Sequence, residues 1–114
     1  MKTLIVINDP PYGTERLYNG LRLAQTLLQR GNEVTVFLMG DAVAGAKRGQ
    51  STPDGFYNAE RMVKGITTKG RVLLCGTCMD ARGLTEEEVV QRAERSTMDA
   101  LAEATEQSER VLVF

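Results

Sequence analysis

The chain has 114 residues, 14 basic and 15 acidic side chains, and no histidine. This length fits about one domain, and the balanced charge provides no basic field to attract nucleic acid or anionic lipid. Without histidine, the usual general base, the commonest metal ligand and the Ser-His or Cys-His nucleophile pair are all excluded. Any chemistry must therefore use thiols, carboxylates, lysines, arginines, hydroxyls or backbone groups.

The first third of the chain predicts two strands joined by a helix. Residues 4–7 form a continuous apolar run, which is typical of a strand buried on both faces of a parallel sheet. We expect Thr14 to cap a helix whose apolar side chains recur at helical spacing until Gly31-Asn32 ends it. Residues 34–39 then predict a second strand, because they are rich in β-branched side chains.

The middle of the chain predicts helical segments around a loop. We expect a short helical segment over residues 42–47 and a loop over residues 48–55, which contain two glycines and Pro53. A helical pattern over residues 56–67 follows. Residues 71–75 predict a third strand.

The C-terminal part predicts a loop over residues 76–83, one long helix and a final strand. Thr85 and Glu88 match the S/T-x-x-E capping box, so we expect a helix from this point to about residue 107, with a break near Arg95. Residues 111–114 predict the last strand, and a short strand near Arg95 would raise the number of strands from four to five. The buried face of the long helix is expected to hold Met98, Leu101, Ala102 and Thr105.

Strands that alternate with helices imply βαβ units and a mostly parallel sheet. Right-handed crossovers place the helices on both faces of such a sheet. We therefore predict a single domain over residues 1–114, a three-layer α/β/α fold of the Rossmann-like or flavodoxin-like kind with four to five strands. No apolar run approaches the ~20 residues of a membrane span, and no export signal is present. The expected compartment is the cytoplasm.

The most specific candidate site is the loop after the third strand. Ligands of open α/β sheets bind beyond the carboxyl ends of the strands, and both cysteines of the chain, Cys75 and Cys78, lie there. Their spacing allows a redox pair, half of a metal site or an activated thiol. Two thiolates do not complete a tetrahedral zinc site, so we expect no metal and no cofactor. Arg82 and the backbone N–H groups of the turn are expected to stabilise a thiolate.

Two other loops leave strand ends and supply candidate binding residues. The first contains two prolines, which remove N–H donors, so it is not a phosphate-binding loop. We expect it to form a rigid wall of the pocket with Asp9, Tyr12 and Gly13. Asp41 follows the second strand in the same way, although Asp9 and Asp41 also suit helix caps.

These motifs together resemble the DsrE/DsrF-like family, and its YchN-type branch most of all, over essentially the whole chain. The resemblance implies a parallel-sheet fold, homotrimers or homohexamers, and a link to sulfur relay. In the TusD-like carriers of the family, a cysteine at the end of the third strand accepts persulfide sulfur, and Cys75 occupies that position here. Cys78 is not shared by those carriers. The segments that carry the resemblance are Asp9-Pro10-Pro11-Tyr12-Gly13-Thr14-Glu15, Leu21-Arg22-Leu23-Ala24, residues 37–43, Arg48-Gly49-Gln50 and Cys75-x-x-Cys78-x-Asp80-x-Arg82-Gly83.

Three functions remain open from the sequence. In the first, a sulfur carrier, the Cys75 thiolate attacks a donor persulfide, holds the terminal sulfur and passes it to an acceptor protein. In the second, Cys75 and Cys78 form a thiol–disulfide or redox-sensing pair. In the third, the protein is a non-enzymatic oligomer that binds a small ligand at the rim of the sheet, and the cysteines are incidental.

Overall fold

A single sheet of five parallel strands organises the molecule. The computed structural model describes all of residues 1–114, and the strand order is β4-β3-β2-β1-β5. The predicted α/β class is therefore confirmed, and the short strand near Arg95 is present as β4. The strands are β1 (Lys2–Ile7), β2 (Glu33–Leu38), β3 (Arg71–Cys75), β4 (Glu94–Ser96) and β5 (Arg110–Val113).

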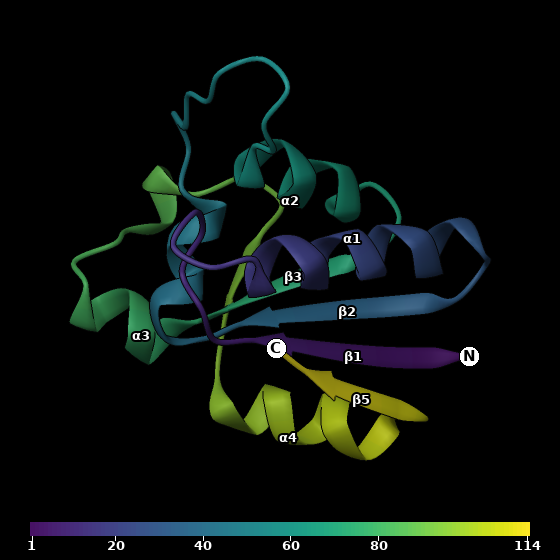
Figure 1. The fold of residues 1–114 in the computed structure, drawn as a ribbon. Helices are drawn as coiled ribbons and strands as arrows, with labels where there is room; N and C mark the ends of the chain where they lie inside the picture. Colours follow the sequence, from purple (N-terminus) through teal and green to yellow (C-terminus); the bar gives the residue numbers. More distant parts are fainter.

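Helices lie on both faces of the sheet (Figure 1). Two of them, α1 and α2, pack side by side on one face, and α4 lies against the other. A short helix, α3, continues directly from the carboxyl end of β3. None of the helices is both long and apolar enough to cross a membrane. The helical elements are α1 (Arg16–Gln29), the 3-10 turn η1 (Gly40–Ala46), α2 (Ala59–Thr67), α3 (Gly76–Ala81), the 3-10 turn η2 (Glu86–Glu88) and α4 (Met98–Gln107).

The three central strands form the middle of the hydrophobic core, because their apolar runs are covered on both faces. Ile5, Phe37 and Leu74 are fully buried, and each side chain of this size contributes roughly 1.5–3 kcal/mol when it leaves water. Helix α1 approaches β1 closely at Gly20, where a Cβ atom would lie 2.7 Å from Cδ1 of Ile7. A side chain larger than hydrogen at this position would therefore push α1 away from β1.

The region after β3 differs from the prediction. Residues 76–83 were expected to be a loop, but Gly76–Ala81 form α3, which Cys75 caps through its sulfur. The capping box of Thr85 and Glu88 is present, yet it caps only η2. The first half of the long helix is absent because Val90 is buried and its backbone N–H donates to the carbonyl of Ala46 at 2.8 Å, whereas the half after the expected break near Arg95 is present as α4. That contact directs the chain back to the sheet, where it extends as β4.

Two helices begin later than predicted. Helix α1 starts at Arg16 with Glu15 at the N-cap position, and Thr14 instead donates its hydroxyl to Asp9 at 2.9 Å. Helix α2 starts at Ala59 rather than at residue 56. Its N-cap is Asn58, whose Oδ1 accepts from the backbone N–H of Arg61 at 3.1 Å.

The segment formed by α4 and β5 is much less covered than predicted. None of its residues is buried. Met98 is 61% exposed and only Leu101 is half-buried among the expected core positions of α4, so that prediction is wrong for Met98, Ala102 and Thr105. The reason is geometric, because β5 is an edge strand with β1 on one side only.

Candidate functional site

The two cysteines lie together at the carboxyl edge of the sheet, in a segment called the cysteine turn below (residues 75–82). Cys75 ends β3 and is 7% exposed, whereas Cys78 is half-buried, and both are free thiols. Sγ of Cys75 accepts from the backbone N–H of Cys78 at 3.4 Å. Sγ of Cys78 accepts from the backbone N–H of Gly40 at 3.1 Å. The second bond ties the cysteine turn to the segment that follows β2.

The Cys75 thiol is harder to ionise than an ordinary cysteine. Burial raises its pKa, and the neighbouring Cys78 side chain raises it further, while the backbone N–H groups of Cys78 and Thr77 act in the opposite direction. Because a free cysteine already has a pKa of about 8.5, Cys75 is a thiol at neutral pH. The backbone N–H groups of the turn thus stabilise the thiolate as expected, but burial outweighs them in the resting protein.

Arg82 and Asp41 meet beside the cysteine turn. Nε and Nη2 of Arg82 lie 2.9 and 2.8 Å from Oδ1 of Asp41, and Nη1 donates to the carbonyl of Cys78 at 3.1 Å. The charge of Arg82 is thus balanced by Asp41 rather than directed at a sulfur. The pair joins η1 to the end of α3 and so fixes the position of the turn.

A second arginine, Arg95, lies close to Cys75, and the sequence analysis missed it. Its two terminal nitrogens donate to the two carboxylate oxygens of Asp80 at 2.8 Å each, and these bonds are the main reason that the pKa of Arg95 is raised and that of Asp80 lowered. The Cys75 charge also raises the pKa of Arg95, to a smaller extent. A Cβ atom on Gly76 would lie 2.9 Å from Cζ of Arg95. The absence of a side chain at Gly76 therefore lets the guanidinium lie beside the cysteine.

Only part of this cluster had a signal in the sequence. Asp80 falls within the cysteine motif that carried the family resemblance, but Arg95 was expected only as the place of a helix break or of a short strand. Its position follows from the pairing of β4 with β3, which sets Arg95 opposite Leu74 and Ser96 opposite Cys75.

Tyr12, in the loop after β1, makes its hydrogen bonds with residues 50–59. Tyr12 has a positive φ of 71°, and its backbone N–H donates to the hydroxyl of Tyr57 at 2.6 Å. Its ring stacks on that of Tyr57 with centroids 5.0 Å apart. Its hydroxyl contacts Gln50 and accepts from the backbone N–H of Ala59 at 3.1 Å. Tyr12 therefore holds residues 50–59 in place.

Asp9 and Gly13 contact residues of their own part of the chain. Asp9 accepts the Thr14 hydroxyl and lies 3.7 Å from Nη1 of Arg16, so it fixes the start of α1. Gly13 is exposed, and a Cβ there would meet only Pro10 at an ordinary 3.8 Å. Of the predicted site residues, hydrogen bonds and an ion pair join Cys75, Cys78, Asp41 and Arg82 in one cluster.

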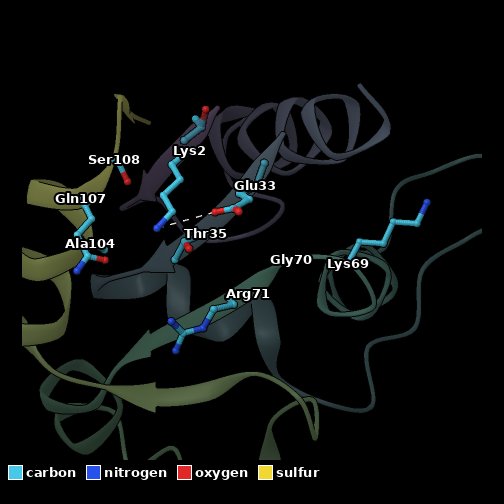
Figure 2. A pocket seen from close by; sticks show the side chains of 11 residues that line it. Lys2, Glu33, Thr35, Lys69, Gly70, Arg71, Ala104, Gln107 and Ser108 are labelled. Atoms are coloured by element: carbon cyan, nitrogen blue, oxygen red, sulfur yellow. Dashed lines mark ion pairs between the residues drawn. The ribbon is translucent and has the colours of Figure 1, made fainter. Parts of the chain in front are cut away.

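A polar recess of about 320 Å³ lies at the opposite end of the sheet, between the amino ends of three strands and the end of α4 (Figure 2). Lys2 reaches toward Glu33 at 3.9 Å (Figure 2), and Arg71 pairs with Glu94 at 3.3 Å. These pairs neutralise much of its positive charge. This amino-end recess contains no cysteine and is lined mainly by Lys2, Glu33, Thr35, Lys69, Arg71 and Gln107.

The cysteine turn has the groups for thiol chemistry. No three histidine, cysteine, aspartate or glutamate side chains gather closely enough to hold a metal ion. Two thiols one helical turn apart are able to accept sulfur, exchange with disulfides or form a disulfide with each other. This edge of the sheet is the candidate active site.

Comparisons with known proteins agree with the fold and the motifs. The profile of the DsrE/DsrF-like family matches residues 1–114. Protein YchN of Escherichia coli is 39% identical over 116 residues, covering 99% of this chain and 98% of that protein. Its crystal structure matches with a TM-score of 0.94, at 38% identity, over 100% of this chain and 99% of the other.

Two further relatives extend this comparison. An uncharacterised protein of Methanopyrus kandleri is 40% identical over 111 residues, which cover 96% of this chain and 91% of that protein. Sulfurtransferase TusD of Salmonella typhi is 29% identical over 128 residues, which cover 100% of this chain and 100% of that protein. The resemblance to the family is therefore confirmed, and one of its distant members is a named sulfurtransferase.

Proposed function

This chain belongs to the DsrE/DsrF-like family, and we propose that it is a sulfur carrier that holds persulfide sulfur on Cys75. The observation that carries the proposal is a free, buried thiol at the carboxyl end of β3, next to a second thiol. The similarity to sulfurtransferase TusD supports the same chemistry.

The proposed reaction is two consecutive exchanges at sulfur. The Cys75 thiolate attacks the terminal sulfur of a donor persulfide, the donor's S–S bond breaks, and the donor leaves as a thiolate that takes up the proton lost by Cys75. An acceptor thiolate then attacks the terminal sulfur on Cys75, and Cys75 leaves as a thiolate. Each step breaks one S–S bond and forms another, so the protein undergoes no net oxidation.

The surroundings of Cys75 suit a carrier in two ways. Burial keeps water away from the loaded sulfur, and the backbone N–H groups of Cys78 and Thr77 favour the thiolate at the moment of attack. The donor and acceptor are expected to be proteins that reach the carboxyl edge of the sheet. The cytoplasm is the compartment in which such thiols stay reduced.

We propose that the carrier is a homo-oligomer, a trimer or a hexamer. The free edge of β5 supports this, because Val111, Leu112 and Val113 are 40%, 37% and 67% exposed, and an apolar edge strand is a template for pairing with another chain. Light scattering is expected to give the mass of a trimer or hexamer for the wild type and a smaller mass for Val113→Lys. A monomeric wild type would contradict this part of the proposal.

Single-thiol variants test the carrier function. Each reduced variant is incubated with a cysteine desulfurase and cysteine, and its intact mass is measured. Cys78→Ser, which keeps Cys75, is expected to gain one sulfur atom, whereas Cys75→Ser is expected to gain none. Equal gain by both variants would show that Cys75 is not the specific acceptor, and no gain by either would overturn the carrier function.

A further inference from the structure

Cys78 has no part in the carrier reaction described above. A thiol that accepts and returns the terminal sulfur needs no second cysteine, yet the structure places one directly beside it. Cys78 is also the more exposed of the two sulfurs. The position of Cys78 therefore indicates a function separate from the transfer of sulfur by Cys75.

The geometry brings Cys78 to the inner sulfur of a loaded Cys75. Sγ of Cys75 points across the first turn of α3, where it accepts the backbone N–H of Cys78 at 3.4 Å. Cys75 is the N-cap residue of α3 and Cys78 is its third residue, so both side chains lie on the first turn, where a disulfide needs Cβ atoms about 3.5–4.5 Å apart. A small tightening of this turn therefore brings the two sulfurs into bonding distance.

Cys78 is held from its other side by the chain. The backbone N–H of Gly40 donates to Sγ of Cys78 at 3.1 Å. The carbonyl of the same residue accepts from Arg82, which Asp41 holds in turn. Both the sulfur and the carbonyl of Cys78 are thus held in place beside Cys75.

We propose that Cys78 is a resolving cysteine that discharges the Cys75 persulfide as hydrogen sulfide. This inference rests on the proposed carrier function and adds a second outcome for the bound sulfur. A sulfur that meets no acceptor is released when Cys78 attacks, and the protein is left as the Cys75–Cys78 disulfide.

The step balances without an added oxidant. The Cys78 thiolate attacks Sγ of Cys75, the bond between Sγ and the terminal sulfur breaks, and the terminal sulfur leaves with the bonding electrons as HS⁻. The terminal sulfur is reduced from the sulfane level to sulfide, and the two cysteine sulfurs are oxidised to a disulfide. A dithiol reductant, of the class that reduces cytoplasmic disulfides, returns the protein to its starting state.

The experiment compares the wild type with Cys78→Ser and Cys78→Ala after loading. All three proteins are loaded by a desulfurase and cysteine and quickly separated from all small thiols, because free cysteine itself releases sulfide from persulfides. Sulfide release and intact mass are then followed over time. Circular dichroism of each variant controls for folding.

The wild type is expected to release about one sulfide for each bound sulfur and to end two hydrogens lighter than the reduced chain, whereas both Cys78 variants keep most of their sulfur. Equal persistence of the persulfide in wild type and variants would overturn the resolving role and leave the carrier function intact. Sulfide release with a disulfide between two chains would also overturn it. Failure of the Cys78 variants to load would instead remove the carrier function on which the inference rests.

Discussion

The two ends of the sheet differ in how they combine volume, charge and reactive groups. The amino-end recess has a volume of about 320 Å³, and its lysine and arginine side chains face glutamates across an open surface. The cysteine turn joins two free thiols to backbone donors and to two arginine–aspartate pairs. The reactive thiols of this molecule therefore lie at the carboxyl ends of its strands, where ligands of open α/β sheets bind, and not in its polar recess.

The pH dependence of loading is the largest effect expected from this comparison. Because the pKa of Cys75 is raised, its thiolate fraction should rise about tenfold per pH unit through the neutral range. The rate at which Cys78→Ser accepts sulfur from a preformed donor persulfide is therefore expected to climb from about pH 6 to pH 8 without levelling off.

A small thiol with an ordinary pKa provides the control for that measurement. The rate for glutathione in place of the protein, corrected for the thiolate fraction of glutathione at each pH, reports how the donor itself responds to pH, and that response is divided out. A loading rate that already levels off below about pH 7 would mean that the Cys75 pKa is lowered, and the account of its environment would be wrong.

Removal of the Arg95 charge should have an intermediate effect. The Arg95→Met variant loses a cation near Cys75, so the thiolate is less favoured and loading at neutral pH should fall on the order of threefold. Gly76→Ala should act in the same direction, because its Cβ would meet the guanidinium at 2.9 Å. If both variants load at the wild-type rate at every pH, Arg95 serves only to anchor α3 through Asp80.

The smallest effect is expected at the amino-end recess. Arg71→Met removes an exposed arginine that is also paired with a glutamate, Glu94, and so it is matched in chemistry to Arg95→Met. Sulfur loading by Arg71→Met should equal that of the wild type within the error of the mass measurement. A loss as large as that of Arg95→Met would show that the recess contributes to the reaction after all.

The sequence predicts the fold well where one physical signal dominates. The apolar runs of β1, β2 and β3 form buried strands, because their apolar pattern favours no other local structure. The site is predictable for a related reason, since both cysteines follow a buried strand and topology places strand ends at one edge. The sequence therefore locates Cys75 and Cys78 without any structure.

The parts that the sequence does not predict depend on contacts between distant segments. A short strand near Arg95 was raised only as an option, because Glu94, Arg95 and Ser96 have no strand pattern; it forms as β4 because β3 offers a free edge. Arg95 was missed for this reason. The positive φ of Tyr12 is likewise set by its contacts with Tyr57 and residues 50–59, which no local pattern reveals.

The location of the added sulfur tests the central claim most directly. Cleavage after Arg71 and Arg82 releases a peptide of residues 72–82 that carries both Cys75 and Cys78. The wild type is loaded briefly, the sulfurs are trapped with an alkylating reagent, and fragmentation of this peptide assigns the extra sulfur. We expect it on Cys75. An extra sulfur found on Cys78 alone, or on neither residue, would contradict the account.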